Sequence, residues 1–217
     1  MPNKPRRFLL LIYRMPASPT AGRVAVWRNL KKMGAVYLQD SACVVPDTAA
    51  LRRELTPVLE RIDATGGRYH LLPIGRLPAG EEDKLIALFV AQTADHYREI
   101  IENCEVDFVK EIEFEHFRRN FTYEEAEEIR MDFEKICTWY ERVRERDWFG
   151  APNRDEARAW LRRCEDLLED FEQKVFEVGG SGAGESEPAV GTGTERGDGS
   201  VELEQAAGDL AEERDRR

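Results

Sequence analysis

The stretch Phe8-Leu9-Leu10-Leu11-Ile12-Tyr13 is a continuous apolar run, and the first part of the chain is organised around it. A run of this length is typical of a buried strand and is far too short to span a bilayer. Basic residues precede it, Arg14 ends it, and no clean small-residue cleavage site follows, so we interpret it as a strand and not as a signal peptide. No targeting or membrane-spanning segment is therefore expected, and the cytoplasm is the default location.

Helices and strands alternate after this first strand. Residues 18–20 have helix-start chemistry, and Gly34 is placed to end the helix that follows. We expect one face of this helix to carry Val24, Trp27, Leu30 and Met33. The later elements are strands over 36–38 and 42–45, a helix capped by Asp47 that contains Pro57, and a strand over 69–74. The order β-α-β-β-α-β predicts a ferredoxin-like domain over residues 6–78.

Residues 79–178 have the pattern of three long amphipathic helices. Apolar residues recur at helical spacing from residue 81 to about 118. Thr122 and Glu125 form a capping box before a heptad-like stripe over residues 126–143, and Asn153 with Glu156 resembles a second cap before the last stripe. We expect an antiparallel three-helix bundle, and hence an α+β chain.

Residues 179–217 are rich in Gly, Ser, Thr and Glu and contain almost no large apolar residue. Such a segment buries too little surface to offset the entropy of ordering it. We expect a disordered acidic tail.

The charges are divided unevenly along the chain. Residues 1–78 contain 13 Lys and Arg against 5 Asp and Glu, whereas residues 79–217 contain 19 against 38. The overall net charge of −11 therefore conceals a basic first domain of net charge +8. Charge separation of this kind concerns association with partners and not the fold.

The candidate binding residues are cations of this basic domain. Arg14 ends the first strand and Arg23 opens the first helix, so we expect them to lie close together. With Arg28, Lys31 and Lys32 they would form a surface for phosphate or another oxyanion. Composition alone favours a plainer interpretation, in which these cations are a solvated face or dock onto the acidic helices.

No catalytic or metal site is predicted. Cys43, Cys104, Cys137 and Cys164 are far apart in sequence, which is typical of reduced thiols and not of a disulfide framework or a zinc site. His70, His96 and His116 are isolated, and the four tryptophans are expected in the core or at a turn. The acidic residues of the helical segment lack the Glu-x-x-His motif of di-iron sites. We expect no catalytic residue, no metal and no cofactor.

Four stretches resemble a known family. Residues 10–16 (LLIYRMP), 23–35 (RVAVWRNLKKMGA), 119–122 (RNFT) and 146–152 (RDWFGAP) are similar to the N-terminal domain of ChrB, the chromate-resistance regulatory protein. The resemblance extends over about residues 6–178. Members of this family continue into a second domain, whereas here the predicted acidic tail follows.

The resemblance implies a DNA-binding transcriptional regulator of a chromate-resistance operon, with chromate as the inducing oxyanion. On that interpretation the five cations become candidates for contact with nucleic acid or an oxyanion. The implied partners are the operator DNA of its own operon, chromate as an effector and a second copy in a homodimer, since ferredoxin-like sheets often pair; no membrane partner is implied.

Two alternatives stay open. The first is a protein-interaction module without direct DNA binding, in which Arg14, Arg28 and Lys32 are buried against carboxylates of the bundle. The second is a metal-dependent nuclease, because the first domain also resembles the ferredoxin-like fold of CRISPR-associated spacer-integration proteins. In the nucleases of that fold an aspartate ends the first strand and binds the metal; here Arg14, a cation, follows Tyr13 and would repel it. A protein that is not an enzyme is therefore expected.

Overall fold

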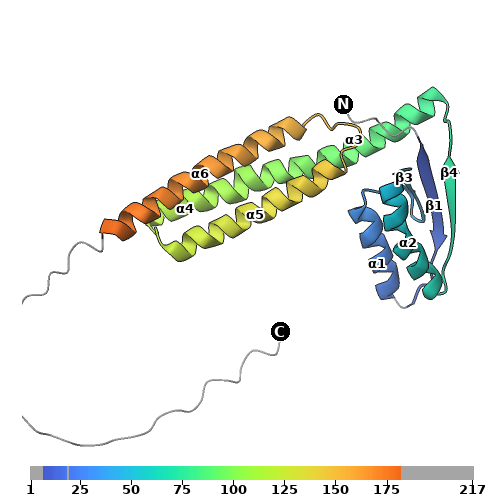
Figure 1. Ribbon diagram of the computed structural model, residues 1–217, viewed down its shortest axis with the longest axis horizontal. Helices are drawn as coiled ribbons and strands as arrows, with labels where there is room; N and C mark the ends of the chain where they lie inside the picture. Colours follow the sequence, from blue (N-terminus) through green and yellow to red (C-terminus); the bar gives the residue numbers. More distant parts are fainter. Residues whose placement is uncertain (1–6, 19, 182–217) are drawn as a thin grey trace, which may run out of the picture. The chain divides into compact units, whose positions relative to one another are not determined.

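The computed structural model describes residues 7–18 and 20–181, and its first six elements follow the predicted β-α-β-β-α-β order (Figure 1). They are β1 (Phe8–Arg14), α1 (Thr20–Lys32), β2 (Val36–Gln39), β3 (Ala42–Pro46), α2 (Ala49–Ala64) and β4 (Arg68–Ile74). The sheet has the strand order β2-β3-β1-β4, and each neighbouring pair is antiparallel. The predicted α+β class is confirmed.

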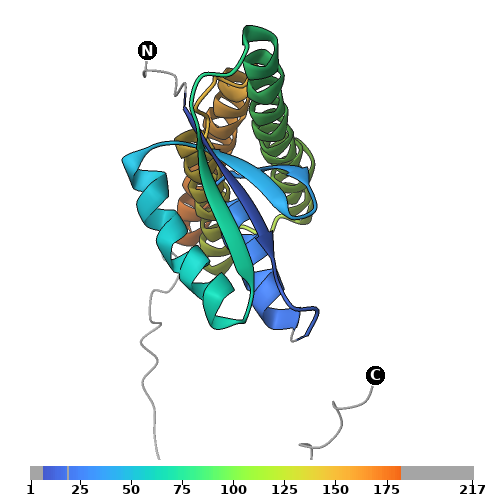
Figure 2. The same ribbon diagram turned by 90° about the vertical axis from the view of Figure 1, so that its right-hand side faces the viewer.

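The two faces of the sheet are packed against different parts of the chain. Helices α1 and α2 lie against one face of the sheet (Figure 2). Leu9 and Leu11 of β1 are buried there in one core with residues of both helices. Because side chains alternate along a strand, Phe8, Leu10 and Ile12 lie on the other face. The Phe8 end of that face is covered by a second core cluster that contains Leu85, Phe89 and Phe149. Further along, Ile12 and its neighbour Leu72 on β4 are 41% and 47% exposed, so this end of the sheet is open.

The buried face of α1 differs from the expected one. Val26, Leu30 and Met33 are buried, whereas Trp27 is 49% exposed and Val24 is only partly buried. The expectation that Trp27 lies in the core is therefore wrong. Leu30 and Met33 belong to both the expected and the observed face. Contact with the sheet selects the side of them that contains Val26 and leaves out Trp27, which lies about 100° further round the helix.

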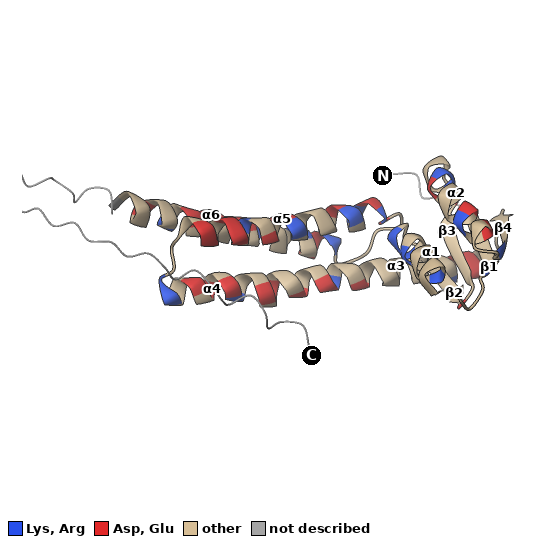
Figure 3. Cartoon of the chain, turned by 90° about the horizontal axis from the view of Figure 1, so that it is seen from below, with Lys and Arg blue, Asp and Glu red and all other residues tan. Residues whose placement is uncertain are grey.

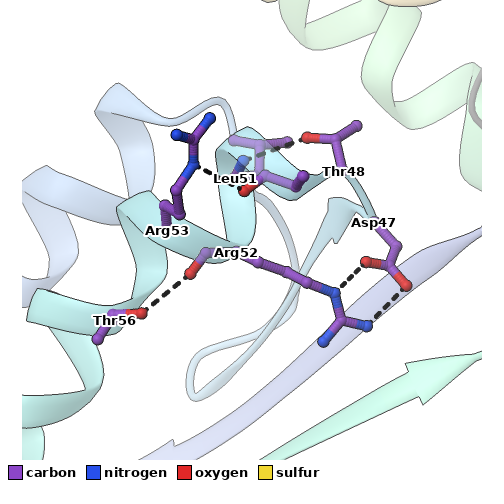
Figure 4. Close-up of polar contacts among 7 residues, drawn as sticks. Asp47, Thr48, Leu51, Arg52, Arg53 and Thr56 are labelled. Carbon is purple, nitrogen blue, oxygen red and sulfur yellow. Dashed lines mark hydrogen bonds and ion pairs between the residues drawn. The ribbon is translucent and has the colours of Figure 1, made fainter.

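Helix α2 begins one residue later than the predicted cap implied. Thr48, and not Asp47, is the N-cap, and its Oγ1 accepts a hydrogen bond from the Leu51 amide at 3.2 Å. Asp47 instead binds the guanidinium of Arg52 (Figure 4). Pro57 lies inside the helix, where it cannot donate to the carbonyl one turn earlier.

The following segment is helical, with one irregularity. Three consecutive elements run through residues 79–118: α3 (Ala79–Glu102), the π-helical segment η1 (Asn103–Phe108) and α4 (Val109–Arg118). Helices α5 (Tyr123–Glu145) and α6 (Arg154–Ser181) complete this region and lie alongside them (Figure 1). One core joins these helices, with Tyr97, Phe108, Ile129, Tyr140 and Phe171 among its buried members.

Of the two caps predicted for these long helices, the one at Thr122 forms. The Thr122 hydroxyl accepts a hydrogen bond from the Glu125 amide at 3.2 Å at the start of α5. The side chain of Asn153 instead donates to the Ala94 carbonyl at 2.9 Å, which ties the start of α6 to α3. The predicted tail begins at Gly179; α6 continues to Ser181, and residues 182–217 lie outside the described residues.

Candidate nucleic-acid interface

Four of the five predicted cations lie on α1, and all four side chains are exposed. At about 100° per residue, Arg28, Lys31 and Lys32 lie on the side of the helix away from Val26, and Arg23 lies on one flank. We call Arg28, Lys31 and Lys32 the basic face of α1. Figure 3 shows Lys and Arg on α1, and Asp and Glu interspersed with Lys and Arg along the long helices.

Arg14, the fifth predicted cation, ends β1 and is exposed. Its direct cross-strand neighbour on β4 is Arg68, which is also exposed and which the sequence analysis did not single out. Arg68 is identified only by the register of β1 against β4. A single sequence does not reveal which residues of two paired strands lie opposite each other.

The expected proximity of Arg14 and Arg23 is supported by contacts of their neighbours. A Cβ atom at Gly22 would lie 3.6 Å from the terminal methyl carbon of Met15. The start of α1 is thus beside the end of β1. Lys31 and Lys32 are at the other end of this 13-residue helix, about 20 Å long at 1.5 Å per residue, so the five cations do not form one cluster.

The five cations have no anionic partner within the described chain. Among residues 7–18 and 20–181, no carboxylate oxygen lies within 4.0 Å of the charged nitrogens of Arg14, Arg23, Arg28, Lys31 or Lys32. The expectation of the interaction-module alternative, that Arg14, Arg28 and Lys32 are buried against bundle carboxylates, is wrong, because these side chains are exposed.

Arg52 provides a contrast within the same domain. Its Nε and Nη2 donate to the two carboxylate oxygens of Asp47 at 2.5 and 2.8 Å (Figure 4). This hydrogen-bonded pair lowers the pKa of Asp47 below its ordinary value. Arg52 is therefore neutralised locally, whereas the cations of α1 and Arg14 are not.

Aromatic side chains accompany the basic face of α1. The Lys31 ammonium lies 5.5 Å from the centre of the Tyr37 ring, a cation–π contact. Trp27, Lys31 and Tyr37 line a shallow hollow of about 370 Å³ at the β2 edge. The Tyr37 hydroxyl in turn lies 3.0 Å from that of Tyr13 on β1.

A larger cleft of about 900 Å³ lies between α1, α2 and α5. Lys32, Arg142, Arg146, Trp139 and Trp148 are among its lining residues, together with Glu54 and Glu145. The Arg146 guanidinium donates to the carbonyl oxygens of Lys31 and Lys32 at 3.2 and 3.1 Å. Burial, with Arg142 nearby, lowers the pKa of Arg146.

Two of the four free cysteines are closer together than their sequence spacing indicates. Cys104 on η1 and Cys164 on α6 lie near enough for each thiol to influence the ionisation of the other. The neighbouring Cys104 thiol, together with burial, raises the pKa of Cys164. Both side chains are buried in the helical core, and burial is typical of inert thiols.

Residues 7–18 and 20–181 contain no candidate metal site and no candidate membrane-spanning helix. No group of three or more His, Cys, Asp or Glu side chains there is arranged to hold a metal ion. No helix of that part of the chain combines the length and the apolar character needed to cross a membrane.

The family model described as "Protein ChrB, N-terminal" matches residues 23–181. The chain belongs to this family. Protein ChrB of Cupriavidus metallidurans is a relative that is 29% identical over 94 residues, which cover 43% of this chain and 29% of the relative. The chain thus spans less than a third of that relative's length.

The ChrB N-terminal match covers most of the candidate interface. It includes the basic face of α1, Arg23 and Arg68, as well as the two later stretches on which the resemblance rested. Arg14 and the rest of β1 precede the matched residues. The resemblance to this family is confirmed.

Proposed function

We propose that this member of the ChrB N-terminal family is a DNA-associated transcriptional regulator of chromate resistance that binds the operator of its own operon. One observation carries the proposal. A chain of net charge −11 keeps the cations Arg14, Arg23, Arg28, Lys31 and Lys32 exposed and without a carboxylate partner in its described part.

Free cations of this kind suit the phosphate backbone of DNA. Each Lys or Arg that neutralises a phosphate releases condensed counterions, and this release favours binding at low salt. The acidic helices, in contrast, repel DNA, so contact through the α/β domain is expected. In this proposal chromate is the effector and the DNA-bound form is a homodimer.

The test is a titration of the full chain against a labelled duplex from the region upstream of its operon, followed by fluorescence anisotropy at several salt concentrations. Binding should weaken steeply as salt rises. The variant Arg28→Gln/Lys32→Gln should lower the magnitude of the slope of log K against log salt by about 2 for each bound protomer, since each phosphate contact contributes about 0.9.

A charge-matched control is available on the long helices. Lys110 of α4 and Arg162 of α6 are exposed, and neither has an ion pair within the described chain. The variant Lys110→Gln/Arg162→Gln removes the same charge and should leave the slope unchanged. If the wild-type chain does not bind the duplex at low salt, the proposal is wrong. If added chromate does not change the affinity, chromate is not the effector.

A further inference from the structure

The open end of the sheet carries an arginine pair that the chain does not neutralise. Arg14 and Arg68 are directly opposite in the β1–β4 register and share the face that carries Ile12 and Leu72. The residues of β1 and β4 on this face include no Asp or Glu; they are Phe8, Leu10, Ile12, Arg14, Arg68, His70, Leu72 and Ile74.

Two like charges opposite each other in a sheet destabilise it, because their Cβ atoms are only about 4.5–5.5 Å apart. Some other arginines do have a carboxylate partner, as at Arg52 with Asp47 and Arg98 with Asp95. Neither Arg14 nor Arg68 has a carboxylate within 4.0 Å in the described residues. An anion from outside the described chain would convert this repulsion into attraction.

The local backbone brings the two arginines together. A Cβ atom at Gly67 would lie 2.8 Å from the Arg14 carbonyl oxygen, so glycine allows β4 to begin in contact with the end of β1. The contact between Met15 and Gly22 places the first turn of α1, with Arg23, beside this end. That turn contains no acidic residue.

We propose that Arg14 and Arg68 form a phosphate clamp that contacts the DNA backbone at a place distinct from the basic face of α1. This inference rests on the proposed function and extends it to a second contact, made by the sheet. Guanidinium groups suit this role because their planar donors bind phosphate oxygens in pairs. A second copy is the poorer occupant, because pairing two such faces would bring four arginines together with no carboxylate on the opposed β1 and β4 residues.

The experiment compares salt slopes of the full chain on the same labelled duplex. Arg14→Gln/Arg68→Gln should lower the magnitude of the slope by about 2 for each bound protomer, additively with Arg28→Gln/Lys32→Gln, whereas Lys110→Gln/Arg162→Gln should not change it. Arg14→Lys/Arg68→Lys keeps the charge and should retain the slope. In the free protein, Arg14→Gln/Arg68→Gln should melt at the same or a higher temperature, because a repulsion is removed.

Each result has a defined meaning. If wild type binds and Arg14→Gln/Arg68→Gln behaves like the Lys110→Gln/Arg162→Gln control, the clamp is refuted and the proposed function stands. If wild type does not bind, both are refuted. If the variant is folded and DNA binding is unchanged but sedimentation shows loss of a dimer, the face serves a second copy and the clamp is refuted. If the glutamine variant does not fold, Arg14→Lys/Arg68→Lys replaces it in the test. A folded lysine variant with a reduced salt slope refutes the clamp.

Discussion

Arg146 illustrates how one residue joins two parts of the fold. Its guanidinium donates to the Lys31 and Lys32 carbonyls at the end of α1 and to the Arg142 carbonyl in the last turn of α5. A cation at a helix C-terminus is favourable because the last carbonyls are unpaired and carry partial negative charge. Arg146 therefore stabilises two helix ends at once, and its positive charge is used within the fold.

Replacing Arg146 by Gln should lower the free energy of unfolding by about 1–3 kcal/mol, the range for charge-assisted hydrogen bonds that lose their donor. Arg144→Gln is the control, since Arg144 is exposed and its ion pair within the described residues is with Glu141 on the same helix. Its cost should stay below about 1 kcal/mol. Urea denaturation followed by circular dichroism measures both, and equal costs for the two variants would contradict this role of Arg146.

At the scale of the element, η1 adjusts the register of a long helical run. Buried residues of this run step by 3, 4, 4, 4 and 3 through Tyr97, Ile100, Cys104, Phe108, Ile112 and Glu115. At about 100° per residue, each step of three turns an α-helical stripe back by about 60° and each step of four turns it forward by about 40°, so the three consecutive steps of four from Ile100 to Ile112 turn it forward by about 120°. The π-helical η1 lies within this forward-turning stretch, where its wider turn offsets part of the rotation, and Cys104 and Phe108 in it are buried.

Deleting Val106, an exposed residue of η1, should convert the segment to α-helix, because the spacing from Cys104 to Phe108 becomes three. The protein should stay folded, with a change of less than about 1 kcal/mol in unfolding free energy, as is usual for changes at exposed positions. Thermal melting checks this.

The matched deletion is Glu134 of α5, an exposed residue in a helix without a π turn. There one missing residue rotates half of the buried stripe by about 100° and should cost more than about 3 kcal/mol or prevent folding. If both deletions lower the unfolding free energy equally, η1 does not accommodate an extra residue in the helical run.

At the scale of the whole molecule, aromatic side chains connect the sheet with the long helices. Phe149 lies 6.3 Å from Phe8 of β1 and 5.4 Å from Phe89 of α3, measured between ring centres. Trp148 packs edge-on against Phe89 at 5.8 Å and also borders the core beneath α1 and α2. The α/β domain and the helical segment therefore share a buried cluster and should unfold together.

Phe149→Ala should remove about 3–5 kcal/mol of unfolding free energy, as is typical for a buried phenylalanine. Phe117→Ala is the control, because Phe117 is 85% exposed and its loss should cost about 0.5 kcal/mol or less. In wild type, helical circular dichroism and tryptophan fluorescence should report one shared transition. Separate transitions in wild type would contradict the coupling of the two parts.

Local patterns were enough to predict most of the elements and the family. The apolar run 8–13, the turn residues, the capping box at Thr122 and the helical stripes act over a few residues, and each led to an observed element. The basic first domain and the acidic helices were likewise readable from composition alone. The position of Arg14 at the end of a strand followed from the same local pattern.

Long-range packing decided the rest. Which face of α1 is buried, and hence that Trp27 is exposed, depends on contact with the sheet. The pairing of Arg14 with Arg68, the contact of Cys104 with Cys164 and the two helix ends joined by Arg146 all unite residues distant in sequence. Sequence by itself determined where charge and apolar surface occur along the chain, because these are properties of single residues and short windows. Tertiary structure alone determined which charges remain without a partner, because neutralisation depends on distances between elements that pack only in the folded chain.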